Sequence, residues 1–198
     1  MGIEMHSRGG HVLHRKRQIV RSERKIRTFK TMTSLIPWAW ENTTKVSFGV
    51  GSIRALAELI KPKSKILVLY DGDHVNKNGV KRDLDGLIAQ CGATGRWRSG
   101  IEANPDYASC MGIVKEFKRD PADLIIAVGG GSVMDATKFI AAAATLPDNV
   151  DPWTVLRDPT YLKKTIPEAT ICKLEATASD WNNVSVISRR ETHDKIGF

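Results

Sequence analysis

Hydrophobic and polar positions along the chain fall into short blocks that predict strands and helices in turn. Two continuous apolar runs, residues 66–70 and 124–128, are typical of strands that are buried on both faces. Weaker strand patterns occupy four stretches: residues 45–48, 96–99, 169–174 and 184–188. Apolar residues at helical spacing predict four helices: residues 52–60, with Ser52 as a candidate N-cap, 80–90, 107–119 and 132–144.

The order of these elements predicts the fold. Strands that alternate with helices at short spacing indicate a parallel sheet with right-handed crossovers. We therefore expect an α/β fold, with a Rossmann-like parallel sheet and flanking helices. Ligands of such sheets bind beyond the carboxyl ends of the strands. The loops in which a site is expected are therefore residues 71–78 and residues 129–132.

Three consecutive glycines follow the clearest strand and lead directly into a helix, as Gly129-Gly130-Gly131-Ser132. Glycines allow a tight turn and a close approach of a ligand to the backbone. Amides at the start of a helix lack partners and carry the positive end of its dipole, and Ser132 adds a hydroxyl at the expected cap position. This combination predicts a pocket for a phosphate or diphosphate. The alternative is a tight turn that merely connects strand and helix.

The spacing of these glycines matches neither the GxGxxG fingerprint nor a Walker A loop, so the motif by itself does not identify the ligand. Asp135 lies in the first turn of the following helix. A carboxylate at this position is stabilised by the helix dipole. Asp135 therefore either caps the helix or faces a bound cofactor.

The net charge of +8 is concentrated at the N-terminus, where the first 30 residues hold nine Lys and Arg against two acids. The remainder is close to neutral, so nucleic acid is not expected as a partner of the domain. We expect residues 1–31 to form a disordered basic extension and residues 32–198 to form the domain. Four origins of the extension stay open: a start codon placed too early, an inert tail, an arm for nucleic acid or an acidic partner, or an organelle-targeting peptide.

Composition excludes several classes of protein. No apolar run approaches the roughly 18 residues of a membrane span, and no secretory signal is visible. The three cysteines, Cys91, Cys110 and Cys172, are odd in number and widely spaced, which argues against a disulfide framework or a zinc ribbon. We therefore expect a cytoplasmic protein with no membrane partner.

Several motifs together resemble the iron-containing (group III) alcohol dehydrogenases, in particular their butanol dehydrogenase and aldehyde reductase branch. Residues 129–138 resemble the GGGSxxDxxK motif of that family. Three other stretches agree with family motifs: residues 47–51 with an FGxG turn, Asn104-Pro105 with an NP motif, and residues 176–180 with an ATGSE loop. The similarity covers roughly residues 33–198.

The resemblance implies the N-terminal domain of the dehydroquinate synthase-like fold, which binds NAD(H) or NADP(H) and transfers hydride to or from an alcohol or aldehyde. It also implies a homodimer through the strand at residues 45–48. The residues that it assigns to the cofactor are Gly130, Gly131 and Ser132 at the diphosphate, Asp135 near the nicotinamide, Thr177 and Ser179 in a later loop, and Lys195 at the nicotinamide ribose. For Lys195, an exposed turn lysine is the alternative.

In that family, an all-helical C-terminal domain supplies the Asp and His ligands of a divalent metal, iron or zinc. Those ligands would lie beyond Phe198, so we expect this chain to lack the helical domain, the metal ligands and any catalytic residue. The isolated chain would then bind nucleotide weakly or not at all and have no turnover. The alternative function is a non-catalytic nucleotide-binding or scaffold module with a basic arm.

Two loops depart from the family pattern. Residues 71–74 read Asp-Gly-Asp-His where this branch commonly has GGGS. Asp71 or Asp73 would repel the 2′-phosphate of NADP and could bind a ribose hydroxyl, which favours NAD unless His74 and Lys77 compensate. Ala178 replaces a glycine, and it would strain the loop if that position requires a positive φ.

Overall fold

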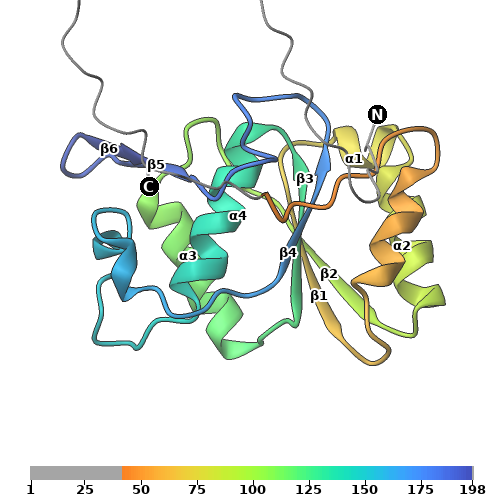
Figure 1. Cartoon of the computed structure of the whole chain (residues 1–198), viewed down its shortest axis with the longest axis horizontal. Coiled ribbons are helices and arrows are strands. Elements are labelled where there is room, and N and C mark those ends of the chain that lie inside the picture. Colours follow the sequence, from red (N-terminus) through yellow and green to blue (C-terminus); the bar gives the residue numbers. More distant parts are fainter. Residues whose placement is uncertain (1–41, 198) are drawn as a thin grey trace, which may run out of the picture.

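Four parallel strands form the central sheet, as Figure 1 shows. They are β1 (Lys65–Tyr70), β2 (Thr94–Arg98), β3 (Leu124–Gly129) and β4 (Glu168–Cys172), in the order β2-β1-β3-β4. The computed structural model describes residues 42–197, so the predictions for residues 1–31 and for the start of the domain lie outside the described residues. The predicted Rossmann-like parallel sheet is confirmed.

Helices cover both faces of this sheet (Figure 1). One face packs against α3 (Tyr107–Arg119) and α4 (Gly131–Ala143), and the other against α2 (Val80–Gln90), the short α1 (His74–Lys77) and the 3-10 helix η1 (Ser52–Glu58). Side chains alternate across a strand, so Leu67 and Leu69 join the core on the α3 and α4 side, whereas Ile66 and Val68 join the core on the α2 side. This two-sided burial explains the continuous apolar runs in the sequence.

A small hairpin lies outside the main sheet, where β5 (Val186–Arg189) pairs antiparallel with β6 (Asp194–Gly197). The carboxylate of Asp106 caps α3 by accepting from the amide of Ala108, and it also accepts from the amide of Arg190. The start of α3 therefore holds the end of β5. Two short 3-10 helices, η2 (Pro152–Thr154) and η3 (Pro159–Tyr161), occupy the crossover between α4 and β4.

The structure differs from the sequence-based expectations in its first described segment. Residues 45–48 form no strand, because they make no ladder hydrogen bonds with the sheet. The homodimer contact expected there stays a prediction. The helix predicted over residues 52–60 is the 3-10 helix η1, Ser52–Glu58, and its apolar residue Leu56 packs in the core. Gly51, with a φ of 77°, occupies its N-cap, so Ser52 does not cap it.

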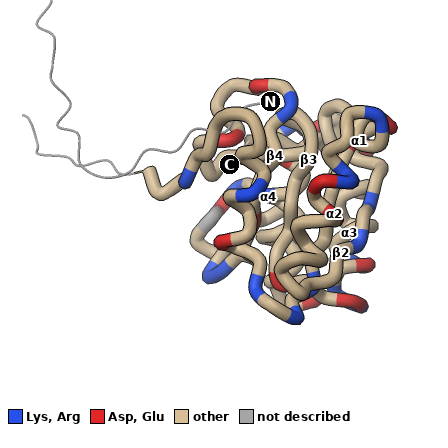
Figure 2. Tube along the Cα trace, turned by 90° about the vertical axis from the view of Figure 1, so that its right-hand side faces the viewer, with Lys and Arg blue, Asp and Glu red and all other residues tan. Residues whose placement is uncertain are grey.

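Charged residues of both signs are interspersed along the described chain (Figure 2). This agrees with the near-neutral balance calculated beyond residue 30. None of the helices in residues 42–197 is both long and apolar enough to cross a bilayer.

Candidate functional site

The glycine turn joins the end of β3 to the start of α4. The helix begins at Gly131, and its N-cap is Gly130 in an extended conformation, with φ −98° and ψ −165°. Ser132 is therefore the second helical residue, and the expectation that it occupies the cap is wrong. The first amides of a helix have no partner inside it, and within residues 42–197 no protein acceptor bonds the amides of Gly131 and Ser132.

Packing inside the protein explains two of the three glycines. A Cβ on Gly129 would lie 2.4 Å from Cγ2 of Val133, and a Cβ on Gly131 would lie 2.5 Å from Cβ of Ala176. Gly130 is different, because a Cβ there would meet its nearest neighbour, in Leu174, at an ordinary 3.5 Å. The internal packing of the protein therefore does not require glycine at position 130. If the segment only connected the strand to the helix, the choice of glycine at this position would have no explanation.

The segment that follows β4 lies against this turn, with Leu174 beside Gly130 and Ala176 beside Gly131. Gly130, Gly131 and Ser132 remain partly exposed, so the turn is neither sealed nor fully open. Two residues of the segment have left-handed backbones, Thr177 with a φ of 41° and Ala178 with a φ of 60°. Ala178 thus has the positive φ under which the loss of the family's glycine strains the loop, and each such residue other than glycine costs about 1–2 kcal/mol.

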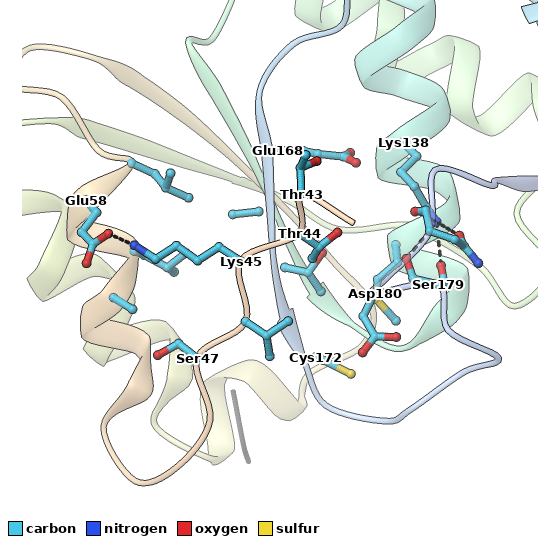
Figure 3. A pocket seen from close by; sticks show the side chains of 18 residues that line it. Thr43, Thr44, Lys45, Ser47, Glu58, Lys138, Glu168, Cys172, Ser179 and Asp180 are labelled. Atoms are coloured by element: carbon cyan, nitrogen blue, oxygen red, sulfur yellow. Dashed lines mark hydrogen bonds and ion pairs between the residues drawn. The ribbon is translucent and has the colours of Figure 1, made fainter. Parts of the chain in front are cut away.

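Asp135 and Lys138, on the helix that follows the glycine turn, hold the end of this segment. The carboxylate of Asp135 accepts a 2.6 Å hydrogen bond from the Ser179 hydroxyl and a 3.2 Å bond from the amide of Val186. The Lys138 ammonium donates to the carbonyl and hydroxyl of Ser179, at 2.9 and 3.0 Å, and to Asn182 (Figure 3). Burial lowers the pKa of Lys138, and the Asp135 charge acts in the other direction. Both residues thus position the loop that covers the turn.

Asp71 follows the last residue of β1, and the sheet register places it beside the glycine turn, because Tyr70 pairs with Val128. Its Oδ1 lies 3.2 Å from Nε2 of His74. A Cβ on Gly129 would lie 2.9 Å from this same oxygen. The side chain of Asp71 is 42% exposed, so part of the carboxylate remains open at the carboxyl edge of the sheet.

Lys195 lies elsewhere. It is an exposed residue of β6, paired with Ser188, and its ammonium donates a 2.7 Å hydrogen bond to Oδ1 of Asn104. Within the described part of the chain, no hydrogen bond or ion pair links Lys195 to the glycine turn. Seven of the eight predicted cofactor residues lie around one edge of the sheet: Asp71, Gly130, Gly131, Ser132, Asp135, Thr177 and Ser179. The eighth, Lys195, lies apart from them and bonds Asn104.

A cavity of about 400 Å³ runs along the outer edge of β4 (Figure 3). The segment of residues 43–47 forms one wall, Glu168 and Cys172 of β4 form another, and Lys138 and Ser179 close one end. Glu168 is exposed as a residue, but its carboxyl lies among the walls of this cavity, and desolvation there raises its pKa to about 7, although the positive charge of Lys138 opposes this shift. Sequence reasoning missed this cavity, since its walls are separated by more than a hundred residues along the chain.

The divalent metal implied by the resemblance does not fit the described residues. Between residues 42 and 197, no group of three or more His, Cys, Asp or Glu side chains is arranged to hold a metal ion. No step of a reaction is therefore assigned to a metal held by these residues.

The fold defines a Rossmann-like α/β protein, of the kind seen in the N-terminal domain of iron-containing alcohol dehydrogenase structures. The solved structure of YqhD from Escherichia coli K-12 matches with a TM-score of 0.69 and 39% identity over 75% of this chain and 38% of that one. The NADH-dependent butanol dehydrogenase A of Thermotoga maritima matches with a TM-score of 0.73 and 29% identity, over 81% and 40% of the two chains.

Sequence comparison identifies the family. A family model described as iron-containing alcohol dehydrogenase matches residues 43–198. The chain is 42% identical over 156 residues to the NADPH-dependent aldehyde reductase YqhD of Escherichia coli (strain K12), covering 78% of this chain and 40% of that protein. It is 34% identical over 155 residues to the NADH-dependent butanol dehydrogenase A of Clostridium acetobutylicum, covering 78% and 39%. The chain belongs to the iron-containing alcohol dehydrogenase family, and it spans about 40% of the length of these relatives.

Proposed function

We propose that this chain forms the cofactor-binding part of an NAD(P)(H)-dependent alcohol dehydrogenase or aldehyde reductase. The amides of Gly131 and Ser132 bind the diphosphate of the dinucleotide at the start of α4. Asp71 lies at the ribose of its adenosine, and Thr177 and Ser179 line the cleft. Asp135 acts through Ser179 and is a positioning residue.

The observation that supports this proposal is the combination of unpaired amides with Gly130. A Cβ at position 130 would make only ordinary contacts with the protein. Packing within the protein therefore does not explain this glycine, whereas the approach of a ligand would. An anion held by the first amides of α4 would occupy the same place, since a Cβ there would block its approach to the backbone. A simple connecting turn has no need of this space.

The family membership supports the chemistry. The nicotinamide of a bound dinucleotide would supply or accept the hydride that interconverts an alcohol and an aldehyde. The residues of this chain would fix the dinucleotide in one orientation and shield part of it from water through the segment that Lys138 and Asp135 hold. Alcohols and aldehydes are proposed as substrates because the relatives are named butanol dehydrogenases and an aldehyde reductase.

Titration of the purified chain with NADH and NADPH, followed by the fluorescence of the reduced nicotinamide, tests this function. We expect Gly130→Ala to weaken both dinucleotides about tenfold or more, or about 1.4 kcal/mol, while the melting temperature stays near that of the parent chain. The matched control is Gly112→Ala, on the exposed side of α3, where a Cβ meets no atom within 4 Å. Equal affinities of the parent chain and Gly130→Ala would show that the turn does not bind the diphosphate.

A further inference from the structure

Charged side chains of both signs line the cavity along the outer edge of β4, and they do not balance one another. They are Lys45, Glu58, Lys138, Glu168 and Asp180. Lys45 and Glu58 form an ion pair with each other, between the segment of residues 43–47 and η1 (Figure 3). This pair has no net charge. The other three residues, together with Asp135 beside Lys138, therefore determine the charge of the cavity.

Three carboxylates surround a single ammonium group at this end of the cavity. The Lys138 ammonium lies 3.5 Å from the carboxylate of Asp135. Burial lowers its pKa, and the charges of Asp135, Glu168 and Asp180 act in the other direction. Among residues 42–197, no group donates a hydrogen bond to the carboxylates of Glu168 and Asp180, and neither forms an ion pair. Two negative charges thus have no counterpart among the described residues once all the carboxylates are ionised.

Glu168 and Asp180 reach this cavity from different parts of the chain. Glu168 is the first residue of β4, and Asp180 belongs to the segment that follows the strand (Figure 3). Desolvation raises the pKa of Glu168 to about 7, so the cavity disfavours its ionised form unless a further cation comes close. A positively charged ligand would supply that cation.

Apolar side chains make up much of the remaining wall. They are Val46, Leu56, Leu59, Met134 and Ala169. The cavity volume of about 400 Å³ lies within the range of small-molecule sites. In the described part of the chain, no group of three or more His, Cys, Asp or Glu side chains could hold a metal ion. An organic cation with an apolar body therefore fits the cavity better than a metal ion does.

We propose that this cavity binds a linear aliphatic diamine, with one ammonium group at Glu168, the second at Asp180 and the methylene chain against the apolar wall. Ammonium groups form strong, charge-assisted hydrogen bonds with carboxylates, and burial of the methylene groups adds to the affinity. The glycine turn does not line the cavity. The diamine would therefore not compete with the dinucleotide, and this inference does not depend on the proposed function.

Isothermal titration calorimetry at pH 8 with aliphatic diamines of increasing chain length tests this inference. We expect the affinity to pass through an optimum length, at which each ammonium group reaches a carboxylate. At that length, the diamine should bind about tenfold more tightly than the monoamine with the same number of carbons. Equal affinities of the diamine and the monoamine, or absence of binding by every diamine at millimolar concentrations, would overturn the inference.

Glu168→Gln and Asp180→Asn should each weaken the diamine about tenfold and the monoamine less than about threefold. Glu175→Gln is the matched control, because it removes the same charge from an exposed residue of the same segment that does not line the cavity. We expect it to leave both affinities unchanged. Equal effects of the three substitutions would show that the amines respond only to the overall charge of the protein, which contradicts binding at two defined carboxylates.

The pH dependence of binding gives a second readout. An ammonium group binds the ionised form of Glu168, so the diamine affinity of the parent chain should rise from about pH 6 to pH 8, across the raised pKa of about 7. The other titratable groups that line the cavity are Lys45, Glu58, Lys138, Cys172 and Asp180. Glu168→Gln keeps all of these groups, so the diamine affinity of this variant should stay constant over the same range. A parallel rise in the variant would contradict a contact between the diamine and Glu168.

Discussion

The hydroxyl of Ser179 donates a 2.6 Å hydrogen bond to the carboxylate of Asp135, and this bond joins the helix of the glycine turn to the segment that covers the turn. The Lys138 ammonium, one turn further along the helix, bonds the same serine. The unpaired amides and the segment above them are thus fixed to one helix. Such a rigid arrangement keeps a binding site in one geometry before the ligand arrives.

Loss of the buried ammonium is expected to loosen this arrangement. The side chains of Lys138 and Asp135 are only 9% and 16% exposed, so Lys138→Met leaves the carboxylate of Asp135 without its charge partner. We expect a loss of about 3 kcal/mol in the free energy of unfolding, because one member of a buried pair remains unpaired. Urea denaturation measures this change. Lys115→Met, at an exposed position of α3, is the control, and a similar loss in both variants would contradict the role of Lys138.

The left-handed backbone of Ala178 predicts a stabilising substitution. Glycine adopts a φ of 60° without steric cost, so we expect Ala178→Gly to stabilise the protein by about 0.5–1 kcal/mol after the larger entropy of the unfolded chain is included. Thermal denaturation should show a higher melting temperature. The same substitution at Ala89, in the last turn of α2, is expected to lower it, and equal shifts in the two variants would refute the strain at Ala178.

Packing at Gly129 predicts a destabilising substitution. A Cβ at this position would overlap Cγ2 of Val133 and crowd Oδ1 of Asp71, at 2.4 and 2.9 Å. Gly129→Ala should therefore lower the free energy of unfolding by about 1–3 kcal/mol, whereas Gly130→Ala should leave it nearly unchanged. Denaturation of the two variants side by side measures the contrast, and equal stabilities would show that the turn tolerates side chains at both positions.

The carboxyl group of Glu168 predicts a pH dependence of stability. Its pKa rises from an ordinary 4.5 to about 7 on folding, so between these values the folded state binds more protons than the unfolded state. Its contribution to stability is then fully present below pH 4.5 and is lost as the pH rises through about 7.

Glu168→Gln should remove this dependence. At pH 8 we expect the variant to be more stable than the parent chain by only about 1 kcal/mol, because solvent reaches the residue and screens its charge. The difference in stability should vanish near pH 4.5. Thermal melts across this pH range measure it. Glu191→Gln, whose parent side chain is 81% exposed, should give parallel curves. A constant offset between the parent chain and Glu168→Gln at all pH values would contradict the shifted pKa.

Elements with strong local signals could be predicted from the sequence. The helices Val80–Gln90 and Tyr107–Arg119 have the predicted bounds, and the buried strands β1 and β3 extend the predictions by one residue each. Amphipathic spacing and continuous apolar runs are properties of the segments themselves. The glycine turn is similarly local, since three glycines between a buried strand and a helix define it.

Elements that depend on a distant partner could not be predicted in the same way. Residues 45–48 have a strand-like pattern, but a strand also requires a neighbour, and none pairs with them among the described residues. The strand β6 has a single large apolar residue, Ile196, and it forms because β5 pairs with it.

The outer edge of β4 has a consequence for the handling of this protein. The amide of Lys173 and the carbonyl of Pro167 point toward β3, so by alternation the backbone groups of Glu168, Thr170 and Cys172 face away from the sheet. Exposed strand edges invite intermolecular pairing and aggregation, and charged side chains discourage it. Above a pH of about 7, where it is ionised, the carboxylate of Glu168 therefore opposes this pairing, and at pH 8 the Glu168→Gln protein, although more stable, should precipitate at lower concentrations than the parent chain.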